Sequence, residues 1–144
     1  MSRADVNGIG IEYQVTGQGR PVVLLHGFPD SGRLWRHQVP ALAGAGFQVI
    51  VPDLRGYGRS DKPEAVEAYS MTRLAGDIMA ILADLGIGRA DIVGHDWGAG
   101  LARAARVTGC SWTPRTRSTP CCWTSSAHAL RSAARTAAAG SPRW

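Results

Sequence analysis

Alternating apolar and polar positions near the start of the chain predict a β-hairpin. In residues 9–15 every second residue is apolar, and Asn7-Gly8 separates this segment from a shorter one that ends at Val6. Asn-Gly is the dipeptide that two-residue hairpin turns prefer. Two mostly apolar runs, 21–26 and 47–52, follow, and each is typical of a strand that is buried on both faces.

Segments with a helical pattern follow these strands. Residues 35–45 are predicted to be helical, with Pro40 either starting or kinking the helix. Ser70 is a candidate N-cap for the next helix, and Gly86 marks the stop beyond its end. The apolar residues between them share one helical face: Met71, Leu74, Ala75, Ile78, Met79, Leu82 and Leu85.

A short strand at 90–93 and a helix that begins near Gly98 complete the pattern. Strands that alternate with helices at these lengths predict the α/β class, with a parallel sheet and helices on its faces. Residues 53–69 are loop-like and are punctuated by Gly56, Gly58 and Pro63. No apolar run approaches the about 18 residues of a membrane span, and no apolar signal core is present, so we expect a cytoplasmic protein without a membrane partner.

The composition divides the 144-residue chain near residue 102. Residues 1–102 hold nine Lys and Arg against eleven Asp and Glu, whereas residues 103–144 hold seven Arg and no acidic residue. The net charge of +5 therefore comes from the last 42 residues. We predict a partial α/β core over 1–102 and a tail over 103–144, rich in Arg, Ala, Ser and Thr, that is disordered or translated out of frame.

Three interpretations of the tail compete. A basic arm that binds nucleic acid would need aromatic or Lys interleaving, which is weak here, so we expect no nucleic-acid partner. A flexible extension is the second. The third is a shifted reading frame, which we favour because the eight residue types that G/C-rich codons give off-register supply 39 of the 42 residues. Cys110, Cys121 and Cys122 match no zinc pattern, and we predict no metal and no cofactor.

The sequence GHDWG at residues 94–98 has the form of the G-x-S-x-G nucleophile elbow with Asp in place of Ser. The glycines allow a sharp strand-to-helix turn that presents Asp96 at the carboxyl end of the sheet. The backbone N–H of Trp97 and the helix N-terminus favour negative charge there. A carboxylate in this place can attack carbon to form an ester, which suits epoxides and alkyl halides. The alternative is that Asp96 only caps the helix.

A second motif, HGFPD at residues 26–30, follows the first buried strand, and its turn can offer the N–H of Phe28 to the same oxyanion. The alternative is a strand-ending turn in which His26 has local hydrogen bonds. A third motif spans residues 53–63. Its glycines are not a phosphate loop, because no helix with GK[ST] follows. We interpret it as a structural loop held by Asp, Arg and Tyr hydrogen bonds.

Residues from about 20 to 101 resemble the N-terminal part of an α/β-hydrolase of the epoxide hydrolase group. The motifs HGFPDSGRLWRHQ, VPDLRGYGRSDKP and VGHDWGA carry the resemblance through their order and spacing. It implies that Asp96 is the nucleophile, that Phe28 and Trp97 supply the oxyanion N–H groups, and that the substrate is a small epoxide or alkyl halide. Haloalkane dehalogenases are similar but commonly carry a polar halide-binding residue where Phe28 stands, so they rank second. The other motif residues are His26, Gly27, Pro29, Gly94, His95 and Gly98.

Such hydrolases also use a later His oriented by an Asp or Glu, lid tyrosines and further strands, all after the elbow. Here His128 is the only later imidazole, and it has no carboxylate after the elbow to orient it. All tyrosines precede the elbow: Tyr13, Tyr57 and Tyr69. We therefore expect a truncated fold without a lid, in which the hydrolytic half of the reaction is lost. A non-catalytic product is the alternative, and the oligomeric state is open.

Overall fold

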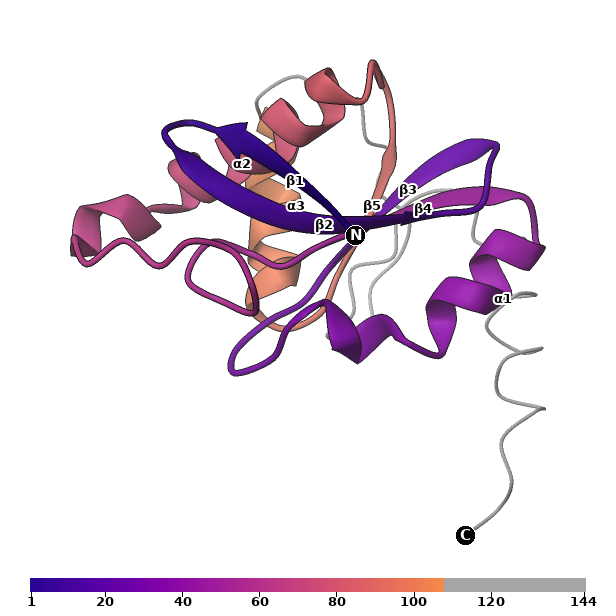
Figure 1. The fold of residues 1–144 in the computed structure, drawn as a ribbon, viewed down its shortest axis with the longest axis horizontal. Coiled ribbons are helices and arrows are strands. Elements are labelled where there is room, and N and C mark those ends of the chain that lie inside the picture. The colour runs from indigo at the N-terminus through magenta and orange to yellow at the C-terminus, as the bar shows by residue number, and fades with distance from the viewer. Residues whose placement is uncertain (108–144) are drawn as a thin grey trace, which may run out of the picture.

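One mixed sheet of five strands, in the order β1-β2-β4-β3-β5, organises the chain (Figure 1). The computed structural model describes residues 1–107. Strands β1 and β2 pair antiparallel, as do β2 and β4, whereas β3 lies parallel to both β4 and β5. The strands are β1 (Ser2–Val6), β2 (Ile9–Thr16), β3 (Arg20–Leu25), β4 (Phe47–Pro52) and β5 (Asp91–Gly94).

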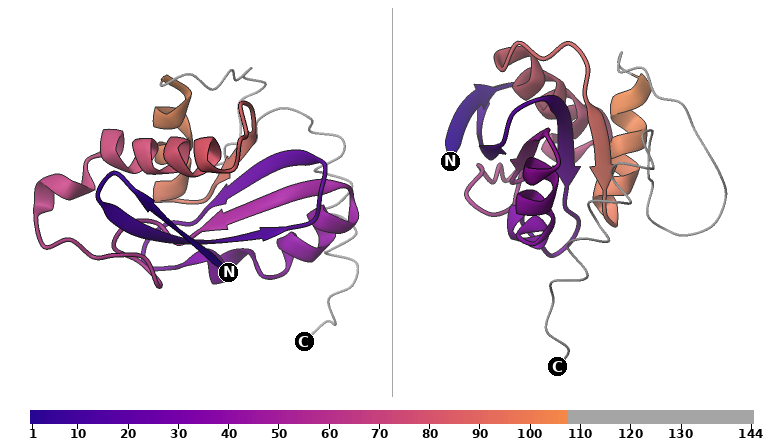
Figure 2. Two further views of the ribbon diagram at one scale, coloured as in Figure 1. Left: turned by 45° about the horizontal axis from the view of Figure 1, so that its top comes forward. Right: turned by 90° about the vertical axis from the view of Figure 1, so that its right-hand side faces the viewer.

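Helices cover both faces of this sheet (Figure 2). Helix α1 lies on one face, and helices α2 and α3 lie on the other. The helices are α1 (Gln38–Gly44), α2 (Met71–Asp84) and α3 (Trp97–Val107), and two short 3-10 turns are η1 (Gly32–Trp35) and η2 (Val66–Tyr69). No helix among residues 1–107 combines the length and the apolar character needed to cross a bilayer. The predicted α/β class, with helices on both faces of the sheet, is confirmed. The expectation of a parallel sheet is wrong in part, because β1 and β2 of the N-terminal hairpin join the sheet by antiparallel pairing.

Strand β3 shows why its sequence is apolar without alternation. Val22 and Leu24 pack in the cluster on the α1 side, whereas Val23 and Leu25 pack in the cluster on the side of α2 and α3. All four side chains are at most 1% exposed. Because successive residues of a strand point to opposite faces, a strand that is covered on both faces needs apolar residues throughout.

The N-terminal hairpin is confirmed. Strands β1 and β2 pair with Val6 opposite Ile9, so that Asn7 and Gly8 form the two-residue turn. Their φ angles are 49° and 76°, and positive values at both positions are what a type I′ turn requires.

The single helix predicted for residues 35–45 is wrong at its start. Residues 32–35 form the 3-10 turn η1, and the α-helix begins only at Gln38. Pro40 lies in the first turn of α1, where backbone N–H groups have no intrahelical acceptor and the missing proline N–H costs little. A helix that began at Trp35 would place Pro40 beyond its first turn, where the proline ring clashes with the carbonyl four residues earlier.

The limits of α2 are confirmed, and its buried face differs in part. The Ser70 hydroxyl accepts the N–H of Arg73 at 3.4 Å, and Gly86 adopts a φ of 67° just beyond the helix. Met71, which we expected on the buried face, is 36% exposed. The buried residues of the helix are Ala75, Asp77, Ile78, Ile81 and Leu82.

Helix α3 runs five residues past the boundary that we expected at residue 102. Ala105 is fully buried and packs in the cluster on the side of α2 and α3. Most of the predicted tail, with Cys110, Cys121, Cys122 and His128, lies outside the described residues.

Hydrogen bonds between side chains and backbone groups hold the loop at residues 53–63, as the sequence indicated. The Asp53 carboxylate accepts the N–H of Gly32 at 2.8 Å and that of Arg59 at 3.0 Å. The Ser60 hydroxyl donates to the Asp53 carbonyl at 2.6 Å. The tyrosine hydrogen bond comes from outside this segment, because it is Tyr69 that donates to the Pro63 carbonyl, at 2.7 Å.

A buried ion pair fastens this loop to α2. The Arg55 guanidinium donates to both oxygens of Asp77, at 2.7 and 2.8 Å, and the two side chains are 2% and 3% exposed. Asp77 also accepts the side-chain amide of Asn7 at 2.9 Å, so the same carboxylate reaches the hairpin turn. This carboxylate therefore joins α2, the loop and the hairpin.

We predict that Asp77→Asn lowers the free energy of unfolding by about 3–5 kcal/mol, because it leaves the Arg55 charge buried without its counter-charge. Urea unfolding of the full chain, followed by far-UV circular dichroism, measures this loss. Glu67→Gln, which removes an exposed carboxylate, is the matched control and should change the free energy by less than about 0.5 kcal/mol. Equal effects of the two substitutions would contradict the role given to the pair.

Candidate active site

Asp96 stands at the sharp turn between β5 and α3, and its backbone adopts a φ of 53°. A non-glycine residue in the left-handed region is uncommon and costs free energy, so the surrounding packing must hold it there. The carboxylate is exposed to solvent. The turn therefore has the geometry expected of a nucleophile elbow, with Asp96 at its apex.

Three glycines make this turn sterically feasible. A Cβ at Gly94 would collide with the Gly98 carbonyl, and a Cβ at Gly98 would collide with the Leu25 carbonyl. A Cβ at Gly27 would lie 2.5 Å from Oδ2 of Asp96. The end of β3, the end of β5 and the start of α3 thus approach one another more closely than any side chain would permit.

The backbone N–H groups of Phe28 and Trp97 lie next to the Asp96 carboxylate. The N–H of Phe28 donates to Oδ2 at 3.0 Å, across 68 positions of the sequence. The N–H groups of Trp97 and Phe28 lower the pKa of Asp96 below its ordinary value, and Trp97 has the larger effect. A helix-capping carboxylate would accept from the second or third helical residue, whereas this one accepts the N–H of Phe28, which lies in a separate turn.

The surroundings of His26 indicate a structural role, because its ring is buried and both ring nitrogens have hydrogen-bond partners. Its ring is fully buried, Nε2 accepts the N–H of Leu54 at 2.9 Å, and Nδ1 lies 3.0 Å from the Gly27 carbonyl. Because Nε2 accepts, the proton lies on Nδ1 and is donated to that carbonyl. Burial lowers the pKa of His26, which keeps the ring neutral. The ring of Tyr57 packs edge-on against it, with centroids 5.4 Å apart.

The remaining motif residues shape the two turns. The N–H of His95 donates to the Leu25 carbonyl at 3.0 Å and thereby ties the end of β5 to that of β3. Pro29 follows Phe28 through a cis peptide bond, and the N–H of Asp30 closes the turn on the Gly27 carbonyl at 3.0 Å. All the residues that the sequence singled out in the two motifs therefore meet at the carboxyl ends of β3 and β5.

A pocket of about 460 Å³ opens beside these turns. Gly27, Phe28 and Trp97 form the side of the pocket next to Asp96. Sequence reasoning missed the other apolar lining residues, most of which it assigned to the core or to a structural loop: Leu54, Tyr57, Tyr69, Met71, Leu74 and Leu101.

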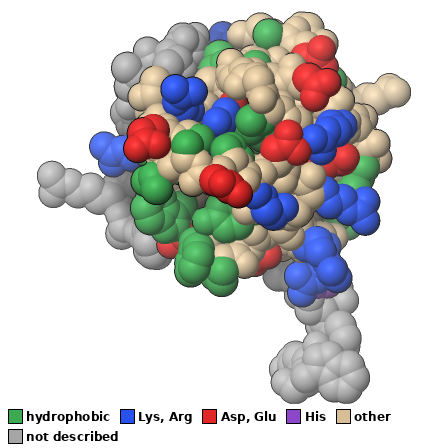
Figure 3. Space-filling view, turned by 60° about the vertical axis from the view of Figure 1, so that its left-hand side comes forward, with side chains coloured by type: hydrophobic (Ala, Val, Ile, Leu, Met, Phe, Trp, Pro, Cys, Tyr) green, Lys and Arg blue, Asp and Glu red, His purple; other side chains and the backbone are tan. Residues whose placement is uncertain are grey.

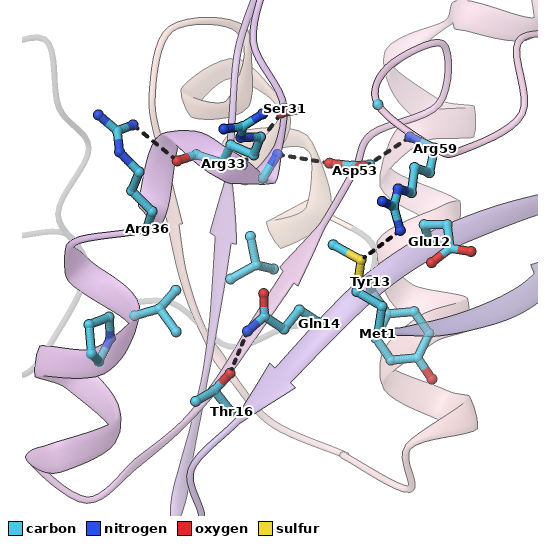
Figure 4. A pocket seen from close by; sticks show the side chains of 15 residues that line it. Met1, Glu12, Tyr13, Gln14, Thr16, Ser31, Arg33, Arg36, Asp53 and Arg59 are labelled. Carbon is cyan, nitrogen blue, oxygen red and sulfur yellow. Dashed lines mark hydrogen bonds between the residues drawn. The ribbon is translucent and has the colours of Figure 1, made fainter.

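A second pocket, of about 550 Å³, lies between α1, η1 and strand β2 (Figure 4). Its lining combines polar residues of β2, such as Glu12 and Gln14, with Arg33, Arg36 and Arg59. Phe28, Asp96 and Trp97 do not line it, so the larger of these two pockets is not the one beside the elbow.

Comparison with known proteins places the chain among hydrolases. A family model described as the alpha/beta hydrolase fold matches residues 20–144. The chain is 54% identical over 97 residues to Epoxide hydrolase A of Mycobacterium tuberculosis, which covers 66% of this chain and 30% of that protein. Epoxide hydrolase B of the same organism is 55% identical over 85 residues, covering 59% and 24%. The chain thus spans less than a third of the length of these two relatives.

Solved structures agree with this assignment. An epoxide hydrolase from Vigna radiata superposes with a TM-score of 0.73 at 36% identity, covering 83% of this chain and 41% of that one. Epoxide Hydrolase A from Mycobacterium thermoresistibile gives a TM-score of 0.70 at 46% identity, with coverages of 72% and 33%. The resemblance to the epoxide hydrolase group inferred from the motifs is confirmed.

We predict that Gly98→Ala destabilises the chain by about 2–4 kcal/mol, because the new methyl group meets the backbone carbonyls of Leu25 and His26. Gly100→Ala, two residues later in the same helix, is the matched control. There a Cβ would lie 3.6 Å from the Met71 methyl group, an ordinary contact, and alanine should stabilise the helix by about 0.5–1 kcal/mol. Thermal unfolding of both variants measures the difference; equal effects would disprove the close approach at the elbow.

Proposed function

We propose, since the chain belongs to the alpha/beta hydrolase fold family, that it acts on epoxides and that Asp96 is its nucleophile. The observation that carries this proposal is the exposed carboxylate at a left-handed turn, with the N–H of Phe28 3.0 Å from its Oδ2. Relatives named as epoxide hydrolases support the substrate class.

The two oxygens of Asp96 have different environments, which suggests how the reaction divides between them. Oδ2 accepts the Phe28 N–H, so Oδ1 is the oxygen available to attack. Attack of Oδ1 on an epoxide carbon forms a C–O ester bond, breaks the C–O bond of the three-membered ring and leaves an alkoxide, which takes a proton from a donor or from water. Oδ2 becomes the ester carbonyl oxygen and keeps its N–H donor.

The same donor would serve the second half of the reaction. Attack of water on the ester carbon places negative charge on the oxygen that Phe28 already faces, which is the arrangement of an oxyanion hole. That water needs a base. His26 is unsuited because both ring nitrogens are engaged in hydrogen bonds. Residues 103–144 contain no Asp or Glu to orient His128, so we expect the ester on this 144-residue chain to persist.

Covalent labelling tests the nucleophile. We expect incubation of the folded full chain with a deuterated glycidyl ether to add one label, at Asp96, as found by intact-mass and peptide mass spectrometry. Asp96→Asn should abolish the label. Asp30→Asn, which removes an exposed carboxylate near Phe28, is the matched control and should keep it. Because the ester is expected to persist, deuterated diol should not form faster than in a protein-free control.

Three other results would count against this proposal. A folded chain without label at Asp96 would favour the non-catalytic alternative. Equal labelling of Asp30 and Asp96 would indicate non-specific alkylation. Label from bromobutane but not from the glycidyl ether would favour a haloalkane dehalogenase-like reaction, which needs no proton donor because halide is the leaving group.

A further inference from the structure

Strand β1 forms one end of the five-stranded sheet, and within residues 1–107 it pairs with β2 alone (Figure 1). Its second edge is therefore open in the part of the chain that the structure describes. The side chains of Arg3 and Asp5 are exposed on this strand. An unpaired strand edge presents backbone N–H and C=O groups that can pair with another chain. This edge is a candidate interaction surface.

The hydrogen bonds of β2 show which backbone groups of β1 face outward. The N–H of Gly10 donates to the Asp61 carboxylate at 2.7 Å, and the Gly10 carbonyl accepts the N–H of Asp61 at 2.9 Å. Both backbone groups of Gly10 thus point away from β1. Asp5 lies opposite Gly10, and in an antiparallel pair opposite residues share the same orientation toward or away from each other. The N–H and C=O groups of Asp5, and those of Arg3 two residues earlier, therefore point to the open edge.

A second copy of the chain fits these outward groups in one antiparallel register. A register centred on Arg3 or on Asp5 would put like charges directly opposite each other, which is destabilising. The register centred on Ala4 puts Arg3 of each copy opposite Asp5 of the other, and each such pair exchanges two backbone hydrogen bonds. The two Ala4 residues would then form a non-hydrogen-bonded pair, where side chains lie closest, and alanine is small enough for that place.

The charges on this edge permit the contact. Arg3 donates through one nitrogen to Asp61 at 2.6 Å and through another to the Arg59 carbonyl at 3.4 Å. A guanidinium has further N–H donors for a second carboxylate. Asp5 forms no ion pair within residues 1–107, so its carboxylate is available to a second copy. On the face shown in Figure 3, acidic and basic side chains are interspersed, so no large field of one sign opposes the approach.

We propose that two copies of this chain pair antiparallel along β1, about a two-fold axis at Ala4, so that their two sheets become one. The contact is isologous, because the same edge serves on both copies. A strand edge of five residues is small for a permanent interface, so the association is weak and depends on protein concentration. The inference is independent of the proposed function, since β5, which leads to Asp96, lies at the opposite end of the sheet.

Sedimentation equilibrium of the full chain, without added N-terminal residues, measures the association. Between about 5 and 500 μM protein at low salt, we expect the average mass to rise from that of a monomer toward that of a dimer. A chain that stays monomeric at about 500 μM would overturn the proposal. So would growth beyond the dimer, because a two-fold contact along β1 uses up the open edge of both copies.

Exchange of the two charges tests the register. Arg3→Asp makes both outward positions acidic, and Asp5→Arg makes both basic, so each variant alone should dimerise about tenfold more weakly or worse. An equimolar mixture of the two variants restores opposite charges at both pairs. Fluorescence-detected sedimentation, with one variant labelled, should show a heterodimer with an affinity near that of the parent chain. Variants that dimerise as the parent does, or a mixture that does not recover, would contradict the register.

Two matched variants control for net charge. Arg89→Asp, just before β5, and Glu67→Arg, in η2, make the same charge changes at exposed positions away from β1. Each alone, and their equimolar mixture, should dimerise as the parent chain does. A loss and recovery equal to those of the β1 variants would show that net charge drives the association and would overturn the proposal.

Amide hydrogen exchange locates the contact in the unmodified chain, so that it does not depend on how well the variants fold. The amide protons of Arg3 and Asp5 should exchange several-fold more slowly at about 500 μM than at about 50 μM, because pairing gives them acceptors. The amide proton of Ala4, which faces β2, should change far less. A dimer without added protection at Arg3 and Asp5 would place the contact on another surface.

Discussion

The close approach of two strand ends at Asp96 is the constraint on which the site depends. Gly27, Gly94 and Gly98 occupy places where a Cβ would meet backbone or the carboxylate itself. Because these three glycines have no side chain, the end of β5 can approach the turn after β3. This approach brings the N–H of Phe28 to the Asp96 carboxylate. Because Asp96 has a φ of 53°, the backbone there is held by its neighbours and not by its own preference.

Buried polar side chains connect this turn to the rest of the fold through hydrogen bonds. His26 joins the turn to Leu54, Arg55 joins the same loop to Asp77 of α2, and Asp77 reaches the hairpin through Asn7. Each of these contacts links segments that lie far apart in sequence. The ion pair with Asp77 also compensates the charge of Arg55. The contact that fixes the loop therefore leaves no uncompensated charge on Arg55 where it lines the neighbouring pocket.

The sequence predicted best where a local pattern and the tertiary structure agree. Strand β4 appears at residues 47–52 as expected, and the GHDWG spacing indicated both the turn and its carboxylate. Asp77 was missed because a helical pattern reveals an apolar face but not a buried charge whose partner, Arg55, lies 22 residues earlier. The pocket was missed for a related reason: Met71 was assigned to the buried face, and only the arrangement of η2, α2 and α3 shows that it borders a cavity.

The role proposed for Asp96 requires a carboxylate that the neighbouring backbone N–H groups keep ionised, and titration of Asp96 measures this most directly. The folded-state pKa is lowered, so the stabilising hydrogen bonds are present above the ordinary pKa of an aspartate and are lost as the pH falls through the folded value. Carbon-13 NMR of the side-chain carboxyl carbon, assigned by its loss in Asp96→Asn, follows the titration. We predict a midpoint below about 3.9, the ordinary value for aspartate. A midpoint at or above that value would contradict the arrangement of Phe28 and Trp97 around the Asp96 carboxylate.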